Sequence, residues 1–374
     1  MPSDSGSTRW TEEEWRMRAK RILGSMFVTL FLIGLLGACN NQQASDGTSI
    51  SEVEDNTTSE IVKEEEADMN TMSGDHPIPQ ELENIPEEYY QAADQQGELV
   101  ELTYNTYESK TYEQKSKALT KRAIVYLPNG YTEEKKYNVL YLMHGGWSNE
   151  TTTLGTPDNP NAFKHVIDHA IESGEVEALI IVCPTYNNES PEDSGDYTLA
   201  FYTLTGNYHN ELINDLIPAV EGTYSTYAES TSSEDIKNSR DHRAFGGFSM
   251  GAVTTWHIFM NSLDEFRYFM PMSGAMDYEG DDVDAAVAAS GHSPEDFFIY
   301  AMTGTDDFEY GNFTSQIEGM LGMPSGNFIL TDNEESGNIA LRIKDGYSHN
   351  GLAARAYTYN GLMWFWNEGE ENKM

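Results

Sequence analysis

A serine flanked by glycines has the surroundings in this sequence that best suit covalent chemistry. Ser249 is the centre of the pentapeptide Gly-Phe-Ser-Met-Gly at residues 247–251, which follows an apolar stretch and precedes a helical-looking run over 252–260. This order is the sequence form of a nucleophile elbow, a strained strand-to-helix turn that exposes the serine hydroxyl, and the glycines remove Cβ atoms that would clash there. Because 31 of the 374 residues are glycine, chance can also produce such a turn, so the serine needs partners.

The base that would activate Ser249 should lie later in the chain. A serine hydroxyl is a poor nucleophile at neutral pH and needs a base that an acid orients. After an elbow of this kind the acid and then the histidine follow in sequence, each on a loop after a strand. His257 falls about 12 Å along the helix after the elbow, and His292 precedes the acidic candidates. We therefore predict that His349, on the loop before the last helix, is the base.

Two adjacent carboxylates compete for the role of the acid. The apolar run 298–302 leads directly into Thr-Gly-Thr-Asp-Asp at 303–307. We predict that Asp307 orients His349, with Asp306 as the alternative, because an unused aspartate in such a loop is a common turn or capping residue. The order of serine, acid and base along the chain is more specific than the pentapeptide alone.

A glycine-containing loop could supply donors for the oxyanion that forms during acyl transfer. One donor should be the backbone N–H of Met250, the residue after the nucleophile, and the second should come from the loop after an earlier strand. The sequence His-Gly-Gly-Trp at 144–147 follows the apolar run 137–143 directly, so we predict the N–H of Gly146 or Trp147. A histidine at position 144 more often orients such a loop by hydrogen bonding than takes part in the chemistry.

Alternating strands and helices would position these residues. Half-exposed antiparallel strands are predicted at 99–104 and 121–127, and more continuously apolar strands at 137–143, 178–183, 268–272, 298–302 and 339–343. Helices are predicted at 162–173, 208–224 and 352–366, besides the one after the elbow. This alternation predicts an α/β protein with a mainly parallel central sheet and helices on both faces, the α/β-hydrolase fold.

The motifs together resemble a known family. The sequence from Glu98 to Trp366 resembles the esterase D-like α/β-hydrolases, and within them the feruloyl esterase modules of bacterial xylan-degrading systems, carbohydrate esterase family 1. The resemblance rests on His144-Gly145-Gly146, the elbow, Gly304-Thr305-Asp306-Asp307 and the late His349. In that family the acid is the aspartate that closes the Gly-Thr-x-Asp motif, which implies Asp307. Tyr347-Ser348 departs from the Gly or Ala that family members place before the final histidine.

The resemblance implies an extracellular serine esterase that releases hydroxycinnamoyl groups, chiefly feruloyl, from plant cell-wall xylan through an acyl-enzyme. The family also leaves an acetyl xylan esterase or a siderophore-type esterase open, and a non-catalytic surface carbohydrate-binding lipoprotein is the alternative of another class. The aromatic residues predicted to contact the sugar or the ferulate ring are Trp147, Tyr186, Phe201 and Tyr202. No cofactor is implied, and we predict no metal, because the acidic cluster at 281–284 lacks the spacing of a calcium loop and suits a solvated helix start.

The amino terminus predicts export. Basic residues precede an apolar run from Ile22 to Ala38, the pattern of a signal peptide. The run closes on Leu-Gly-Ala-Cys, which resembles the lipobox of bacterial lipoproteins. We predict a lipoprotein signal peptide over 1–38, with Met17 as an alternative start, and lipidation of Cys39, which would anchor an extracellular protein to the bacterial cell membrane by acyl chains. An uncleaved membrane anchor is the alternative.

Composition divides the rest of the chain. Residues 39–84 are rich in Ser, Thr, Asn, Asp and Glu, so we predict a disordered acidic tether before an esterase domain over 85–374. A formal net charge of −40 argues against nucleic acid as a partner, because phosphate would be repelled. The remaining predicted partners are polysaccharide esters, and the membrane only through Cys39. Cys183 lies in an apolar run without a basic neighbour and is predicted to be a core residue.

Overall fold

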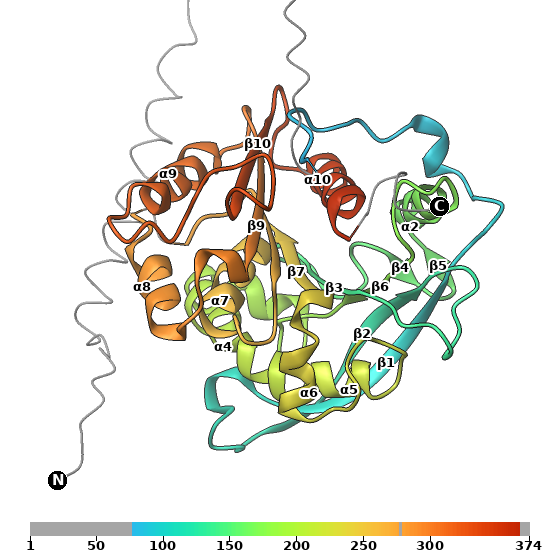
Figure 1. The fold of residues 1–374 in the computed structure, drawn as a ribbon. Helices are drawn as coiled ribbons and strands as arrows, with labels where there is room; N and C mark the ends of the chain where they lie inside the picture. Colours follow the sequence, from blue (N-terminus) through green and yellow to red (C-terminus); the bar gives the residue numbers. More distant parts are fainter. Residues whose placement is uncertain (1–76, 277–278, 367–374) are drawn as a thin grey trace, which may run out of the picture. The chain divides into compact units, whose positions relative to one another are not determined.

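Eight strands form one central sheet in the residues that the computed structural model describes, 77–276 and 279–366 (Figure 1). The strands are β1 (Glu98–Tyr107), β2 (Ala118–Leu127), β3 (Val139–Met143), β6 (Ile180–Cys183), β7 (Arg243–Phe248), β8 (Tyr268–Met272), β9 (Phe298–Gly304) and β10 (Ile339–Lys344). Their order is β1-β2-β6-β3-β7-β8-β9-β10. β2 pairs antiparallel with β1 and β6, and all the other neighbours pair parallel. The predicted mainly parallel sheet is confirmed.

Successive side chains of the central strands enter two different cores, one on each face of the sheet. In β2, Val125 belongs to one cluster of buried side chains and Tyr126 to the other. In β7, Phe245 and Ala244 are divided in the same way. This division follows from the period of two along a strand. Because both faces are buried, the parallel strands appear in the sequence as continuous apolar runs.

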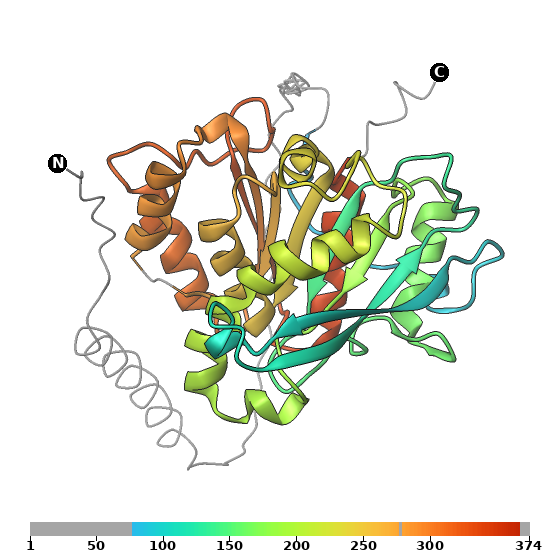
Figure 2. The same ribbon diagram turned by 90° about the horizontal axis from the view of Figure 1, so that it is seen from below.

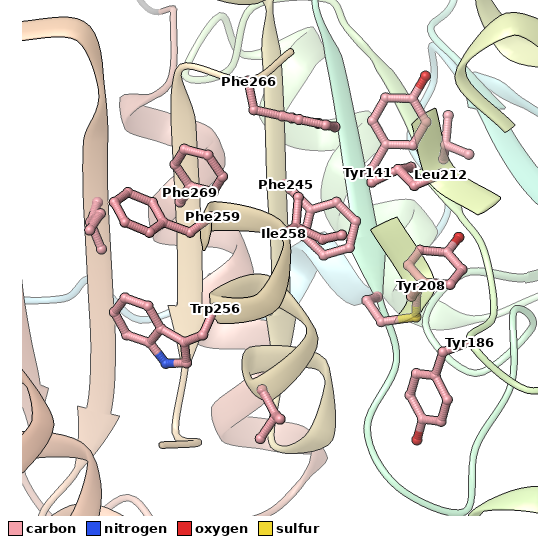
Figure 3. Close-up of a cluster of buried hydrophobic side chains, with 14 of the residues drawn as sticks. Tyr141, Tyr186, Tyr208, Leu212, Phe245, Trp256, Ile258, Phe259, Phe266 and Phe269 are labelled. Atoms are coloured by element: carbon pink, nitrogen blue, oxygen red, sulfur yellow. The ribbon is translucent and has the colours of Figure 1, made fainter. Parts of the chain in front are cut away.

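Helices cover both faces of the sheet (Figures 1 and 2). The core that contains Tyr126 is covered by α2 (Ala162–Glu172) and α10 (Gly351–Trp364). The opposite core is covered by α4 (Thr205–Glu211), α5 (Ile217–Glu221), α7 (Met250–Asn261), α8 (Asp281–Ser290) and α9 (Tyr310–Leu321). Figure 3 shows the aromatic side chains of this second core, where Phe259 of α7 meets Phe269 of β8 edge to face at 4.9 Å.

The long helix predicted at 208–224 begins earlier and is not a regular α-helix. It runs as α3 (Tyr197–Leu199), a π turn over Ala200–Leu204, α4, a second π turn over Leu212–Leu216, and α5. It starts at Tyr197 because the Asp196 carboxylate accepts the N–H of Leu199 and caps the helix there. Each π turn shifts the register of the residues that follow it. The apolar period of 3.6 is therefore interrupted, which hides the true start.

The segment 77–84, which composition assigns to the disordered tether, is part of the fold. Ile78 and Leu82 are buried, and the Arg342 guanidinium donates to the carbonyl of Pro79. The tether prediction is therefore wrong for this segment. Two apolar side chains and polar partners from distant parts of the chain order a stretch whose composition alone is polar.

Several predictions fall on residues 1–76, which lie outside the described residues. They are the signal peptide over 1–38, the lipidation of Cys39 and the tether over 39–76. Among the residues that are described, no helix has the length and apolar character needed to span a membrane.

Two smaller predictions from the sequence, for Cys183 and for the acidic cluster at 281–284, are confirmed. Cys183 is buried at the end of β6, and burial raises the pKa of its thiol to about 12. The acidic cluster at 281–284 opens α8, where its carboxylates lie near the positive end of the helix dipole. The described residues also contain the short strands β4 (Gly155–Thr156) and β5 (Asn159–Pro160), the α-helix α6 (Ser233–Asn238) and several 3-10 turns.

Candidate active site

Ser249 stands at a sharp turn between β7 and α7. Its backbone has φ 60° and ψ −119°, a conformation that non-glycine residues rarely adopt. The Ser249 N–H donates to the carbonyl of Met272 in β8 at 2.9 Å. A Cβ atom on Gly247 would lie 2.7 Å from the backbone of Gly251, and a Cβ on Gly251 would lie 2.5 Å from the carbonyl oxygen of Met143. Only glycine fits at both positions, so the pentapeptide folds as a nucleophile elbow.

The loops after β9 and β10 bring one carboxylate to one histidine. These strands are parallel neighbours, so the loops that follow them meet at the same edge of the sheet. His349 Nδ1 donates to the two carboxylate oxygens of Asp307 at 2.8 and 3.0 Å. The Asp307 side chain is 0% exposed and that of His349 14% exposed. Asp306 is exposed, and its backbone N–H donates to the carbonyl of Tyr347. A proton on Nδ1 leaves Nε2 as an acceptor, the form that a general base needs.

Two phenyl rings pack against the His349 ring. The ring centroid of Phe248 lies 4.5 Å away and that of Phe308 lies 4.2 Å away. Both contacts fix the orientation of the imidazole beside Asp307. Phe308 is 69% exposed and was not predicted from the sequence. Its place directly after Asp307 is the signal that could have identified it.

A cavity of about 750 Å³ opens beside the elbow. Ser249, His349 and the loop 144–147 all line it. In the part of the chain that the structure describes, Ser249 and His349 face this common cavity without a direct hydrogen bond between their side chains. Catalytic hydrogen bonds are often long in a ligand-free enzyme and tighten when substrate binds.

The loop after β3 is held by hydrogen bonds to neutral groups. His144 is buried, its Nδ1 donates to the carbonyl of Gly145 at 2.7 Å, and its Nε2 accepts the hydroxyl of Thr185 at 2.7 Å. Burial lowers the pKa of His144 to about 4, so the ring is neutral at neutral pH. The hydroxyl of Tyr186 also donates to the carbonyl of Gly145, at 2.9 Å. These bonds orient the loop beside Ser249.

The predicted oxyanion donors lie on this loop and at the start of α7. Met250 is the first residue of α7, so its N–H is among those left without a partner inside the helix. Gly146 and Trp147 line the cavity. A Cβ atom on Gly145 would be 3.5 Å from the Cβ of Ser249, which places the loop directly against the serine.

Three of the four aromatic residues predicted to contact substrate do not line the cavity. Tyr186 is 0% exposed and Phe201 is buried in the core (Figure 3 shows Tyr186). Tyr202 packs against the same core. These predictions are wrong because the side chains pack toward the core. The hydroxyl of Tyr186 donates to the carbonyl of Gly145 instead. Trp147 does line the cavity and is 67% exposed.

A buried ion pair supports the loop from behind. Lys121 of β2 and Glu211 of α4 are 2.7 Å apart, and both side chains are 3% exposed. Lys121 also donates to the carbonyl of Thr185 at 2.7 Å, the residue whose hydroxyl meets His144, and the hydroxyl of Tyr104 donates to Glu211 at 2.6 Å. The sequence analysis missed this pair. The available signal was the position of Lys121 on the same strand face as the apolar Ala123 and Val125.

The other two histidines after the elbow lie outside the cavity lining. His257 packs against α4, and burial lowers its pKa to about 4. His292 meets Asp264 at 2.9 Å near the surface. Within the described ranges, no group of three or more His, Cys, Asp and Glu residues is arranged to hold a metal ion.

The family follows from comparison with known proteins. The Esterase family model matches residues 118–336, more than half of the chain. The chain belongs to the Esterase family. It is a carboxylic ester hydrolase.

Among solved structures, this esterase is similar to a serine-to-alanine variant of the feruloyl esterase module from Clostridium thermocellum, complexed with sinapinate. The two sequences are 36% identical, and the TM-score is 0.66 over 79% of this chain and 97% of that one. The structure of FAE is 35% identical, with a TM-score of 0.67 over 80% and 98% of the two chains. The predicted α/β-hydrolase fold and the resemblance to feruloyl esterase modules are confirmed.

The curated relatives are longer proteins. The esterase is 38% identical over 289 residues to endo-1,4-beta-xylanase Y of Acetivibrio thermocellus, which is 76% of this chain and 24% of the xylanase. An endo-1,4-beta-xylanase/feruloyl esterase of Xylanibacter ruminicola is 27% identical over 179 residues, 46% of this chain and 22% of the relative. The chain thus spans at most 24% of the length of these two proteins.

Proposed function

We propose that this esterase hydrolyses hydroxycinnamoyl esters, chiefly feruloyl, of plant cell-wall xylan, with Ser249 as nucleophile, His349 as base and Asp307 as the acid that orients it. The observation that carries the proposal is the pairing of His349 with a fully buried Asp307 at a cavity shared with the elbow serine. Identity of 36% to a feruloyl esterase module, over nearly all of that module, supports the choice of acyl group.

The reaction would proceed through an acyl-enzyme. Ser249 Oγ attacks the ester carbonyl while His349 Nε2 accepts the hydroxyl proton, and Asp307 stabilises the imidazolium that forms. The oxyanion would be held by the N–H of Met250 and of Gly146 or Trp147. Collapse of the tetrahedral intermediate breaks the bond to the alcohol oxygen, which leaves with the proton from His349. Water then attacks the acyl-enzyme by the same steps and releases the acid.

The acyl group should be aromatic because apolar and aromatic side chains surround the serine. Trp147 and Phe308 line the cavity with large exposed faces, which suits stacking on a phenolic ring or a sugar. The related module was crystallised with sinapinate, a hydroxycinnamate. An acetyl group would leave these faces unused.

The proposed location is outside the cell, with Cys39 lipidated after removal of residues 1–38 and a tether that ends before Pro77. Labelling of cells with a radioactive fatty acid tests the anchor. The full chain should carry the label and a Cys39→Ala variant should not, and label on both would contradict the lipobox.

The test of the reaction uses two substrates and one variant. Wild-type enzyme should release ferulate from feruloylated arabinoxylan faster than acetate from acetylated xylan, and Ser249→Ala should lose both activities while keeping the wild-type melting temperature. Faster release of acetate would favour an acetyl xylan esterase. Binding of both polysaccharides without hydrolysis by the wild type would leave a carbohydrate-binding protein.

A further inference from the structure

An arginine lines the cavity together with Ser249 and His349. Arg355 lies on α10, whose first residue, Gly351, follows the loop of His349. Among the described residues that line the cavity, Arg355 is the only Lys or Arg, and none is Asp or Glu. The proposed reaction gives this cation no role.

The Arg355 side chain has no counter-charge in the described part of the chain. Its Nε atom is buried and makes no hydrogen bond. Its own helix offers none either, since Gly351, Leu352, Thr358 and Tyr359 occupy the positions three and four residues away. A buried polar or charged group without a partner is costly. In a chain with 62 acidic and 22 basic residues, carboxylate partners are abundant, so the exception points to a ligand.

Arg355 is half-buried, and the two arginines of the described residues that are fully buried are both paired. The Arg243 side chain meets Glu221 at 2.6 Å and is 2% exposed. Arg342, 6% exposed, meets Asp332 at 2.8 Å. These two guanidinium groups show how this fold neutralises a structural arginine. Arg355 differs from both because its side chain lines a cavity and meets no carboxylate in the described part of the chain.

The position of Arg355 on α10 adds to the positive potential. A Cβ atom on Gly351 would lie 3.4 Å from Nη1 of Arg355, so the guanidinium turns back toward the start of the helix. A cation is disfavoured there because the amino end of a helix is itself positive. The first residues of α2, Ala162 and Phe163, line the same cavity, so the amino ends of two helices and one guanidinium all face it. The positive ends of both helices therefore add to the charge of Arg355 in favouring an anion in this cavity.

We propose that Arg355 forms a carboxylate subsite, so that the enzyme prefers esters that carry a free carboxylate apart from the ester bond it cuts. A guanidinium binds a carboxylate through two parallel hydrogen bonds. The carboxylate can belong to the alcohol side, as in a uronic acid unit of the polysaccharide, or to the acyl side, as in a dimeric hydroxycinnamate with its second carboxyl group free. The subsite as a specificity element rests on the proposed esterase reaction at Ser249.

The test compares matched esters that differ by one carboxylate. For the alcohol side the pair is the feruloyl esters of glucuronic acid and of glucose. For the acyl side it is the monomethyl and dimethyl esters of a dimeric ferulate. The wild type should show a higher kcat/KM for the charged member of at least one pair, and the pair that shows it identifies the source of the carboxylate. The preference should shrink as salt is added, because salt screens the attraction.

Variants of Arg355 decide whether this residue is responsible. Arg355→Gln should lower the charged-to-neutral ratio of kcat/KM by about 10- to 100-fold, the range expected for a lost charged hydrogen-bonded pair. Arg355→Lys keeps the charge but not the planar fork and should retain part of the ratio. Lys237→Gln removes one positive charge on exposed α6, where Lys237 meets Asp264, and should leave the ratio unchanged. The same ratio in wild type and Arg355→Gln, with equal melting temperatures, would overturn the proposal.

Binding separates this proposal from the catalytic one. In the Ser249→Ala variant, calorimetry should show tighter binding of the charged ester than of the neutral one, and Arg355→Gln added to that variant should remove the difference. If the wild type hydrolyses none of the esters while this binding difference persists, the reaction proposal fails and the anion subsite stands. If hydrolysis is normal and the difference is absent, the subsite fails alone.

Discussion

Two histidines line the cavity with Ser249, and their partners are of opposite kinds. His349 donates to the buried carboxylate of Asp307 and packs against two phenyl rings. His144 bonds only a carbonyl and a hydroxyl, and burial lowers its pKa to about 4. The first histidine thus has a carboxylate partner, and the second has only neutral partners and is itself neutral at neutral pH. The same residue type is therefore suited to carry a proton on one side of the cavity and to hold a loop on the other.

The largest effect should come from removing the counter-charge of His349. Asp307→Asn should lower kcat for methyl ferulate by about 10³- to 10⁴-fold, because the imidazolium loses its carboxylate and the ring its favoured tautomer. Asp306→Asn is the matched control, since Asp306 is the exposed neighbour, and it should change kcat by less than about threefold. Steady-state kinetics at neutral pH measures both. Equal losses of kcat in the two variants would show that Asp307 has no special role at His349, and the contrast with His144 would then fail.

Low pH should destabilise the fold through His144, because this histidine is buried in its neutral form. Its pKa is about 4 in the folded protein and about 6.5 when unfolded, so the unfolded state binds more protons between these values. The free energy of unfolding should therefore fall as pH drops from about 6.5 to 4, by about 3 kcal/mol from this residue. His144→Gln lacks this titration. Urea unfolding at pH 7 and at pH 4.5 should show the gap between wild type and variant narrowing at the lower pH, and a constant gap would contradict the assignment.

The smallest effect should come from the hydroxyl that His144 accepts. Thr185→Val removes that donor and leaves a buried Nε2 without a partner, so kcat should fall by about 10-fold as the loop loosens. Thr185→Ser keeps the hydroxyl and should stay close to the wild type. Kinetics with methyl ferulate compares the two. A valine variant as active as the serine variant would mean that the loop is positioned without this bond.

The residues that sequence located well are those bound to local motifs. The elbow at Ser249 follows from glycines that exclude Cβ atoms within a few residues, and the loop positions of Asp307 and His349 follow from strands that are continuous apolar runs. The sequence could not decide between Asp306 and Asp307, because they are adjacent and only the fold shows which side chain points inward. In the structure Asp307 meets His349, and Asp306 is exposed.

The features that sequence missed depend on distant contacts. Tyr186 comes shortly after β6, and only its partner Gly145, from the loop after β3, shows that it turns inward. The segment 77–84 is ordered by Arg342, far along the chain. Arg355 carried a local signal, the absence of an acidic residue three or four positions away, but its meaning depends on a cavity that composition cannot reveal.

The most direct test of the central claim is the site of covalent labelling by a fluorophosphonate. Ser249 Oγ should form a bond to phosphorus as fluoride leaves and His349 takes the hydroxyl proton. Peptide mass spectrometry should then find one phosphonyl group, on the peptide that contains Ser249, in wild type and Asp306→Asn, and little or none in His349→Ala. Inactivation with the label on a different residue, or full labelling of Ser249 without loss of ester hydrolysis, would contradict the account.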